Sequence, residues 1–417
     1  MNDAVTPPTL TAVSDDEYLF TWDCGIQATV DRIAEHSHEL SANISISSTR
    51  PPSPGSIYPA ARINLMSPQT RDRLANACAK RDPDLDWDAI IGQMCVKAQD
   101  RWRAGEPAID MRTYQMPTTP RWLLEPFVER DDATVVFAQG GSGKSMFALA
   151  VAVTIGSGHE VVGRLNGATG PVMYLDWETG PATFRERIGA ICAGAGIPIP
   201  PVHYRRMVSS LPESAAEVAK ERRRIGAVFA VVDSLGMARG GEPESADLTI
   251  RTFKAGRQMG VPWLAVDHVT KADGREATEP FGSAYTRNAA RLMWSLTKAQ
   301  TPEGSQIALR LRKANNGSEG LQAAYSVSMA SNENDRLSEI HYMPIQLDQS
   351  AFTDRGPIKR RIEQALVHSL GMTRAELVTA TAGGKRNVEN AVSELKGQQK
   401  LLEMPGGYLR FVRADDA

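Results

Sequence analysis

Four short apolar runs in the middle of the chain each end in polar or acidic residues. They cover residues 134–138, 171–176, 227–233 and 262–268. Uninterrupted apolar runs of this length are typical of parallel strands that helices cover on both faces. These runs therefore predict an α/β fold built on a parallel sheet. The polar residues then lie at the carboxyl ends of the strands, where open α/β folds bind their ligands.

The first hundred or so residues show a different pattern. Residues 25–40 predict a helix, and the alternation over 42–48 predicts a strand. Ser67 and Asp86 are typical N-cap residues, and each begins a further helix. Apolar residues at three- and four-residue spacing in the last helix predict a core or subunit-interface face. They are Trp87, Ile90, Ile91, Met94, Ala98 and Trp102.

The last sixty residues predict three helices followed by a β-hairpin. The helices cover 358–370, 373–379 and 384–400, and the hairpin covers 401–412 with its turn at 405–407. Three helices and a hairpin are typical of a winged-helix domain, whose third helix usually enters the major groove of DNA. Many winged helices bind proteins instead, so both partners remain alternatives.

The first apolar run leads into a glycine-rich segment and then a helix. The segment 138–145 reads Ala-Gln-Gly-Gly-Ser-Gly-Lys-Ser, which follows the phosphate-loop pattern G-x-x-x-x-G-K-[ST] with Ala138 in the first position. The glycines let consecutive backbone N–H groups turn toward phosphates. We expect Lys144 to reach the β- and γ-phosphate oxygens and Ser145 to ligate Mg²⁺. The expected nucleotide contacts are Gly140, Gly141, Ser142, Gly143, Lys144, Ser145 and Met146.

Polar residues after the other three runs are candidates for hydrolysis. Asp233 is expected to hold the water shell of Mg²⁺ opposite Ser145, with helix capping as the alternative. Glu178 is the candidate general base for the attacking water, although it also suits the first turn of the following helix. Asp176 is the substitute for Glu178 in this role. His268 is either a sensor of the γ-phosphate or a structural hydrogen-bonding residue.

These motifs occur with others in an order that resembles the RecA-fold hexameric P-loop ATPases and helicases of the RepA plasmid type. The resemblance covers approximately residues 120–345. It rests on Gly-Gly-Ser-Gly-Lys-Ser, Tyr-Leu-Asp-Trp-Glu, Val-Val-Asp-Ser-Leu, Val-Asp-His-Val-Thr-Lys, Gly-Ser-Ala-Tyr, Asn-Ala-Ala-Arg and Arg-Lys-Ala-Asn-Asn-Gly. It implies that Glu178 is the hydrolytic base and that His268 senses the phosphate.

The same resemblance implies cations that face the phosphates. Arg187 and Arg291 would be phosphate-facing arginines, at least one of them donated by a neighbouring subunit, with Lys313 near the same contact. DnaB-type helicases carry an arginine two positions after this lysine, where this chain has Asn315. Arg291 is therefore the expected arginine finger, which would stabilise charge on the γ-phosphoryl oxygens and couple hydrolysis to ring geometry. The alternatives for the finger are Arg287 and Arg312.

The length of the chain and the distribution of its charge indicate several domains. A chain of 417 residues is longer than one ordinary core supports. We expect a small α+β domain over 1–105, a linker over 106–120, a RecA-like ATPase core over 121–353 and a winged helix over 354–417. The net charge of −2 argues against a uniformly basic coat for nucleic acid, but residues 355–413 carry eleven Lys or Arg against five Asp or Glu. This local excess of +6 favours contact with DNA.

Cysteine usage and the amino terminus bear on the compartment. The four cysteines are scattered and form no Cys-x-x-Cys pair, which predicts reduced thiols and neither a zinc site nor a disulfide framework. The first residues show no secretory leader, and no apolar run approaches the length of a membrane span. These features predict a cytoplasmic protein without a membrane partner.

The combined prediction is an ATP-dependent DNA helicase or translocase that acts as a homo-hexameric ring in phage or plasmid-type replication, with ATP and Mg²⁺. The loop 269–283 carries Lys271 and Arg275 and is expected to track single-stranded DNA in the channel. Lys385 and Arg386, at the start of the third carboxyl-terminal helix, are expected to contact duplex DNA. The alternative is an ATP-gated DNA-binding initiator, loader or regulator that hydrolyses slowly and does not unwind.

Overall fold

The structure, a computed structural model, divides into two compact units by its internal contacts. One unit contains Met1–Thr119, Leu211–Ile225 and Lys254–Gly260, and the other contains Pro120–Ser210, Gly226–Phe253 and Val261–Ala417. The residues that the structure describes are 5–14, 17–50, 54–130, 133–167, 169–242, 244–269, 284–302, 304–316, 321–347, 358–367, 369, 371–381 and 384–412.

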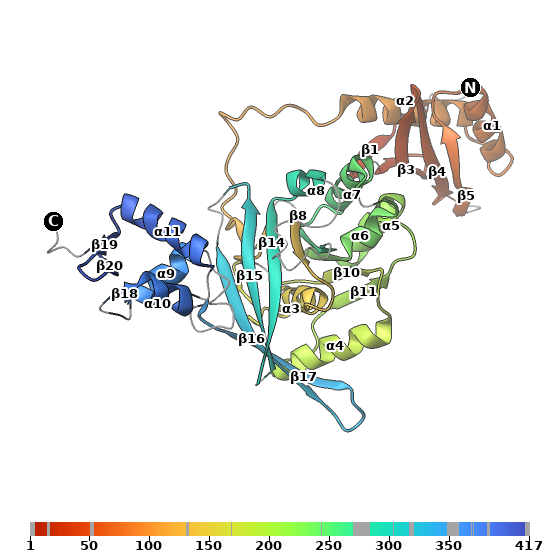
Figure 1. Ribbon diagram of the computed structural model, residues 1–417. Helices are drawn as coiled ribbons and strands as arrows, with labels where there is room; N and C mark the ends of the chain where they lie inside the picture. The colour runs from red at the N-terminus through yellow and green to blue at the C-terminus, as the bar shows by residue number, and fades with distance from the viewer. Residues whose placement is uncertain are drawn as a thin grey trace. The chain divides into compact units, whose positions relative to one another are not determined.

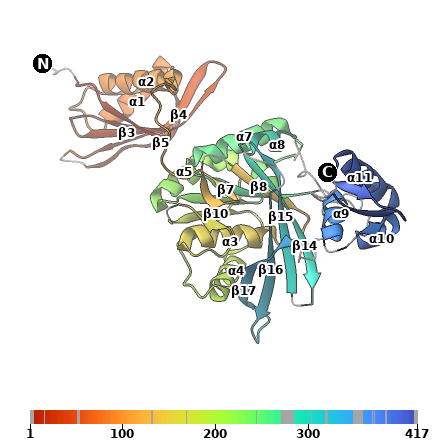
Figure 2. The same cartoon turned by 90° about the vertical axis from the view of Figure 1, so that its left-hand side faces the viewer.

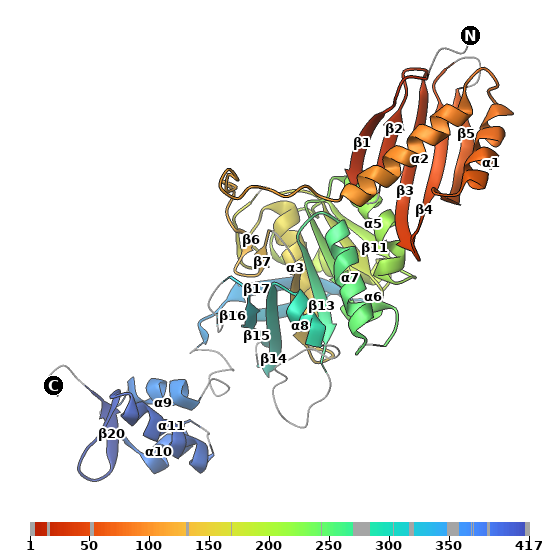
Figure 3. The same cartoon turned by 90° about the horizontal axis from the view of Figure 1, so that it is seen from above.

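A five-stranded antiparallel sheet forms the basis of the amino-terminal unit. The elements of this unit are β1 (Thr9–Ser14), β2 (Glu17–Thr21), β3 (Ile26–His36), β4 (Glu39–Ser48), β5 (Gly55–Asn64), α1 (Pro68–Ala79), α2 (Trp87–Ala104) and α5 (Leu211–Ile225). The five strands pair in chain order, and α1 and α2 lie on one face of the sheet (Figure 3). Alternate residues of β4 are buried, the period-two pattern of a sheet with one covered face.

The two predicted N-caps are confirmed. The Ser67 side chain accepts a hydrogen bond from the Thr70 N–H, and the Asp86 side chain accepts one from the Ala89 N–H. The predicted apolar face of α2 is also confirmed, since all of its residues except the partly buried Trp102 are buried in the core of this unit.

The predicted helix over residues 25–40 is wrong. β3 occupies most of this range and buries Ile26, Ala28 and Val30 at every second position. The alternation then breaks at a β-bulge, where Arg32 has a φ of 51° and the strand register shifts. The bulge moves the next buried residue, Ile33, to a spacing of three, and that spacing imitates a helical pattern.

A nine-stranded mixed sheet forms the basis of the second unit (Figure 1). Its strands are β8 (Ala133–Ala138), β10 (Val172–Asp176), β11 (Val202–Arg206), β12 (Phe229–Asp233), β13 (Trp263–His268), β14 (Leu292–Thr301), β15 (Gly304–Ala314), β16 (Gln322–Ser331) and β17 (Leu337–Pro344). They lie in the order β11-β10-β12-β13-β8-β14-β15-β16-β17. The four apolar runs are buried strands that pair in parallel with their neighbours, as predicted. β14 continues the parallel part, and β15 to β17 extend it as an antiparallel meander.

Helices cover both faces of this sheet. The remaining elements of the core are β6 (Trp122–Glu125), β7 (Val128–Glu129), β9 (Arg164–Leu165), α3 (Lys144–Ser157), α4 (Pro181–Gly194), α6 (Leu235–Arg239), α7 (Ala246–Gln258) and α8 (Ala284–Ala289). α3 and α4 lie on one side of the sheet and α8 on the other (Figure 2). α3 is buried around nearly its whole circumference, which explains its apolar sequence.

Strand register places the predicted site residues at one edge of the sheet. Ala138 pairs with His268, and Asp176 pairs with Asp233, each at the end of its strand. We call the side of the sheet formed by the carboxyl ends of β8, β10, β12 and β13 the carboxyl edge; it runs across the strand ends and is not an edge strand. The opposite side, formed by the starts of β8 and β14, is the amino edge.

The last strand of the meander is attached closely to α4. Gly194 lies so near β17 that an added Cβ would be 2.1 Å from the Ile340 carbonyl oxygen. The Glu186 carboxylate on α4 accepts a hydrogen bond of 2.8 Å from the Leu337 N–H. These contacts fix the meander to the parallel part of the core.

The carboxyl-terminal segment has its own hydrophobic core. Its elements are α9 (Ile358–Val367), β18 (Met372–Thr373), α10 (Arg374–Ala380), α11 (Lys385–Gly397), β19 (Leu401–Glu403) and β20 (Tyr408–Phe411). The predicted three helices and hairpin are present, and Thr373 and Glu376 form a capping box at the start of α10. Neither these helices nor any other in the described part of the chain is long and apolar enough to cross a membrane.

Candidate functional site

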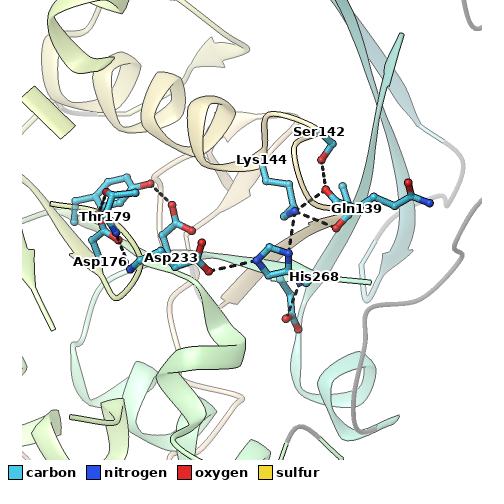
Figure 4. A network of polar contacts seen from close by, with 11 residues as sticks. Gln139, Ser142, Lys144, Asp176, Thr179, Asp233 and His268 are labelled. Carbon is cyan, nitrogen blue, oxygen red and sulfur yellow. Dashed lines mark hydrogen bonds and ion pairs between the residues drawn. The ribbon is translucent and has the colours of Figure 1, made fainter. Parts of the chain in front are cut away.

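The phosphate loop connects β8 to α3 at the carboxyl edge (Figure 4). Gly141 and Gly143 have φ values of 73° and 93°, a region that favours glycine. A Cβ added at Gly140, Gly141 or Gly143 would meet no other group within 4 Å, so the loop borders open space. Open space beside backbone amides at a helix N-terminus suits phosphate groups. The Ser142 hydroxyl donates to the Gln139 carbonyl at 2.7 Å, whereas the Met146 side chain packs against the core.

Lys144 is buried at the base of this loop. Its Nζ donates to the carbonyl oxygens of Ala138 at 3.0 Å and Gln139 at 2.9 Å, and it lies 3.4 Å from His268 Nδ1. Burial lowers the pKa of Lys144, while the carboxylates of Asp233, Glu178 and Asp267 oppose that shift. The ammonium group is therefore held by carbonyl oxygens beside several acids, in the position that a phosphate-binding cation needs.

Asp233 and Ser145 have the chemistry of a Mg²⁺ site. Tyr174 donates its hydroxyl to Asp233 Oδ2 at 2.7 Å, but the buried Oδ1 has no hydrogen-bond partner in the described part of the chain. Burial raises the pKa of Asp233, and the Tyr174 and Ser145 hydroxyls oppose the shift. A buried carboxylate oxygen without a partner fits a bound cation or its water, so these residues fit Mg²⁺. The described residues hold no group of three or more His, Cys, Asp or Glu that could bind a metal ion.

Asp176 is occupied by structural contacts and cannot easily replace Glu178. Its Oδ1 accepts the N–H groups of Glu178 at 2.8 Å and Thr179 at 3.0 Å, and its Oδ2 accepts the Thr179 hydroxyl. Tyr204 in turn donates to the Thr179 carbonyl oxygen at 2.8 Å. The buried Asp176 carboxylate thus shapes the turn that presents Glu178.

Glu178 and His268 face each other across the carboxyl edge. His268 Nε2 lies 3.3 Å from Glu178 Oε1, and the two side chains are 44% and 37% exposed. The imidazole of His268 therefore contacts Lys144 through Nδ1, as Figure 4 shows, and this carboxylate through Nε2. Both groups are accessible to water and to a ligand. The structure therefore brings together Lys144, Glu178, Asp233 and His268, as the sequence predicted.

Arg187 also lies near this edge. It is a partly buried residue of α4. Burial and the Asp233 carboxylate raise the pKa of Tyr174, whereas the charge of Arg187 opposes the shift. The guanidinium is therefore within electrostatic reach of the Tyr174 and Asp233 pair.

Arg291 and Lys313 lie at the amino edge instead. The Arg291 N–H donates to the Ala133 carbonyl oxygen at 2.9 Å, at the start of β8. The phosphate loop begins five residues later, about 16 Å away at roughly 3.3 Å per strand residue. Lys313 Nζ donates to the carbonyl oxygens of Arg287, Asn288 and Ala290, at the end of α8. Neither cation approaches the phosphate loop of its own chain.

Of the four residues predicted to contact DNA, the structure describes only two. Lys271 and Arg275 lie outside the described residues. Lys385 and Arg386 are exposed in the first turn of α11, and in the described segments neither forms an ion pair. Other basic side chains of the carboxyl-terminal segment are paired, as Lys359–Glu394, Arg374–Glu403, Lys396–Glu403 and Lys400–Glu363.

Two side chains at or behind the site, those of Tyr174 and Arg239, were not predicted from the sequence. Tyr174 holds Asp233, and Arg239 forms a buried ion pair with Asp267. Tyr174 lies within an apolar run, where it is indistinguishable from a core residue. Arg239 and Asp267 are 28 residues apart, so no local spacing relates them.

Comparisons with known proteins bear on the core. Residues 105–274 match a protein-family model described as an AAA domain. No curated protein matches the chain at a significant level.

Several solved structures are similar to about half of the chain. A KaiC-like protein from the hyperthermophilic archaeon Pyrococcus horikoshii is 14% identical, with a TM-score of 0.37 over 53% of this chain and 94% of that chain. The RadB recombinase is 17% identical, with a TM-score of 0.37 over 48% and 89%. The flagellar accessory protein FlaH from Methanocaldococcus jannaschii is 11% identical, with a TM-score of 0.35 over 52% and 91%. Likenesses at this level carry no inference about activity.

Proposed function

We propose that the core of this chain, whose residues 105–274 match a family model described as an AAA domain, is a P-loop ATPase of the RecA fold that hydrolyses ATP at the carboxyl edge. One observation carries the proposal. Lys144 Nζ lies 3.4 Å from His268 Nδ1, and His268 Nε2 lies 3.3 Å from Glu178 Oε1. The imidazole of His268 therefore lies in contact with both a phosphate-binding cation and an accessible carboxylate, two groups that hydrolysis requires.

Each side chain has a role in this proposal. The loop amides and Lys144 bind the β- and γ-phosphates. Glu178, free of the turn contacts that occupy Asp176, accepts a proton from the attacking water. His268 contacts both Lys144 and Glu178, so loss of the γ-phosphate changes its partners. Ser145 and Asp233 would hold Mg²⁺, which would supply positive charge beside the phosphates.

We extend the proposal to a homo-hexameric ring. Arg291 and Lys313 lie at the amino edge, too far from the phosphate loop of their own chain to act there. An arginine at this edge can face the nucleotide of a second copy, where it would stabilise charge on the γ-phosphoryl group. Arg187, near the Asp233 pair, would act within its own chain.

We further propose that the ring is a DNA helicase or translocase. The carboxyl-terminal segment, interpreted as a winged helix, exposes Lys385 and Arg386 at the start of its third helix, which suits contact with duplex phosphates. Lys271 and Arg275 would contact a single strand. The same two exposed cations also favour the alternative, an ATP-gated initiator or loader that binds duplex DNA and does not unwind.

Glu178→Gln tests the hydrolytic role. This variant should bind ATP as the wild type does and lose about a hundredfold or more of its turnover, since the amide keeps the shape but cannot accept the proton. Asp176→Asn is the matched control, and it should lower thermal stability more than turnover because its carboxylate holds a turn. Phosphate release and nucleotide titration measure both effects. Normal turnover in Glu178→Gln together with an inactive Asp176→Asn would show that Asp176, and not Glu178, is the general base.

Strand separation decides between the two proposed activities. The wild type and Glu178→Gln would be incubated with ATP, Mg²⁺ and a forked duplex labelled with a fluorophore and a quencher. Unwinding by the wild type alone supports the helicase. Duplex binding without strand separation, at any protein concentration that saturates the fork, supports the initiator or loader.

A further inference from the structure

A buried ion pair lies directly behind the Glu178 and His268 pair. Arg239, the last residue of α6, donates from Nη2 to Asp267 Oδ2 at 3.1 Å. The two side chains are 0% and 3% exposed. The same nitrogen donates to the Thr286 hydroxyl on α8 at 2.8 Å. Nε and Nη1 of Arg239 are buried without a hydrogen-bond partner in the segments that the structure describes.

Stability alone does not explain this pair. Removing two charges from water costs free energy that their mutual attraction often fails to repay, and apolar residues of similar size are often as stable or more stable. The two guanidinium nitrogens that have no partner among the described residues add to that penalty. The pair therefore points to a constraint on geometry.

The hydrogen bond of the second Asp267 oxygen shows which group the ion pair holds in place. Oδ1 accepts a hydrogen bond of 2.9 Å from the backbone N–H of His268. One carboxylate thus joins the guanidinium of Arg239 to the backbone of the residue whose imidazole contacts Lys144 and Glu178. Arg239 also follows Asp233 by six residues, so it joins the end of β12 to the end of β13.

We propose that Arg239 is a positioning residue: through Asp267 it fixes the backbone of His268, and thereby the place of the imidazole between Lys144 and Glu178. This inference deepens the proposed hydrolysis and rests on it for its kinetic consequence. Within the described segments, the hydrogen bonds of Arg239 go to Asp267 and Thr286, so its effect on turnover passes through Asp267. Small displacements of a reacting group can lower the rate about a hundredfold.

The test uses a double variant that leaves no unpaired buried charge. Arg239→Met alone would leave Asp267 buried without its cation and can fail to fold. Arg239→Met with Asp267→Leu removes both charges and should fold, with a thermal midpoint close to that of the wild type. It should bind ADP with an affinity within about threefold of the wild type and lose about tenfold or more in kcat.

A second readout separates positioning from general loosening. The protein labelled at histidine carbons would be examined by NMR without nucleotide, and His268→Gln would identify the His268 ring signal among the seven histidines. The double variant should shift that signal. Thr286→Val is the matched control, because it removes a hydrogen bond of the same Arg239 nitrogen but leaves the Asp267 pair intact, and it should leave the signal in place.

Three results would overturn the inference. They are a normal kcat in a folded double variant, an unchanged His268 signal in that variant, and an equal shift in Thr286→Val. If the wild-type protein hydrolyses no ATP, the proposed function fails, and the NMR comparison still decides whether the pair of Arg239 and Asp267 positions His268.

Discussion

At the scale of single residues, the site depends on side chains that hold other side chains. Asp233 Oδ2 accepts a hydrogen bond from the Tyr174 hydroxyl, whereas Oδ1 has no hydrogen-bond partner in the described segments. This hydrogen bond fixes the rotation of the carboxylate, so that Oδ1 has a defined direction. Groups that orient a metal-binding carboxylate typically contribute ten- to hundredfold in metal affinity.

Tyr174→Phe is therefore expected to weaken Mg²⁺ binding. The Mg²⁺ concentration for half-maximal binding of a fluorescent ATP analogue should rise about tenfold, because the carboxylate loses its fixed orientation. Tyr325→Phe is the control, since its buried hydroxyl accepts a hydrogen bond from the Gly163 N–H in the same unit, away from the carboxyl edge. An equal rise in both variants would assign the effect to loosened packing.

At the scale of elements, the antiparallel meander depends on its contact with α4. The closest approach is at Gly194, where the backbone of β17 leaves no room for a side chain. A backbone carbonyl cannot move aside as a flexible side chain can, so α4 and β17 would have to separate.

Gly194→Ala should lower the free energy of unfolding by about 1–3 kcal/mol, the usual range for overpacking. Gly189→Ala on the same helix is the control, because its added Cβ would meet only the end of the flexible Arg185 side chain. That substitution should be neutral or stabilising, since alanine favours a helix over glycine by up to about 1 kcal/mol. Urea denaturation followed by circular dichroism compares the two. Equal stabilities would show that β17 adjusts freely.

At the scale of the whole molecule, the two edges of the core divide the proposed active site between copies of the chain. Glu178 lies at the carboxyl edge and Arg291 at the amino edge. In the proposed ring, a complete site would need Glu178 from one subunit and Arg291 from the next.

Mixing two inactive variants tests this division. Arg291→Ala should lose about a thousandfold in turnover, as expected for an arginine finger, and Glu178→Gln should be similarly inactive. A mixture should regain part of the activity, because some interfaces join an intact Glu178 to an intact Arg291. Mixing Lys144→Ala with Glu178→Gln is the control and should regain none, since both residues belong to one edge. A mixture of the first pair that stays inactive would remove Arg291 from the site.

Contact with duplex DNA is tested by two charge-matched double variants. Lys385→Ala with Arg386→Ala removes exposed cations, whereas Lys396→Ala with Lys400→Ala removes two that are paired with Glu403 and Glu363. The first variant should bind duplex DNA more weakly and show a shallower dependence on salt by about two counterions. The second should stay near the wild type. Fluorescence anisotropy across a salt series measures both, and equal effects would mean that only net charge matters.

The sequence by itself determined the local chemistry of the core. Apolar runs predicted the parallel strands, because a strand covered on both faces needs apolar residues throughout. The glycines of the phosphate loop and the residues that end β10, β12 and β13 followed from the same pattern, since a strand end places its next side chain at the sheet edge. The N-caps Ser67 and Asp86 could also be predicted from the sequence, because an N-cap accepts a hydrogen bond from a residue only three positions away.

Only the tertiary structure decided which distant groups meet. It paired Arg239 with Asp267, set Tyr174 against Asp233 and showed that Asp176 is occupied by turn contacts whereas Glu178 faces His268. It also placed Arg291 at the edge opposite the phosphate loop, and it replaced the predicted helix over 25–40 by a bulged strand. Strand order and register determine these contacts, and they result from packing of the whole chain, so no local spacing in the sequence encodes them.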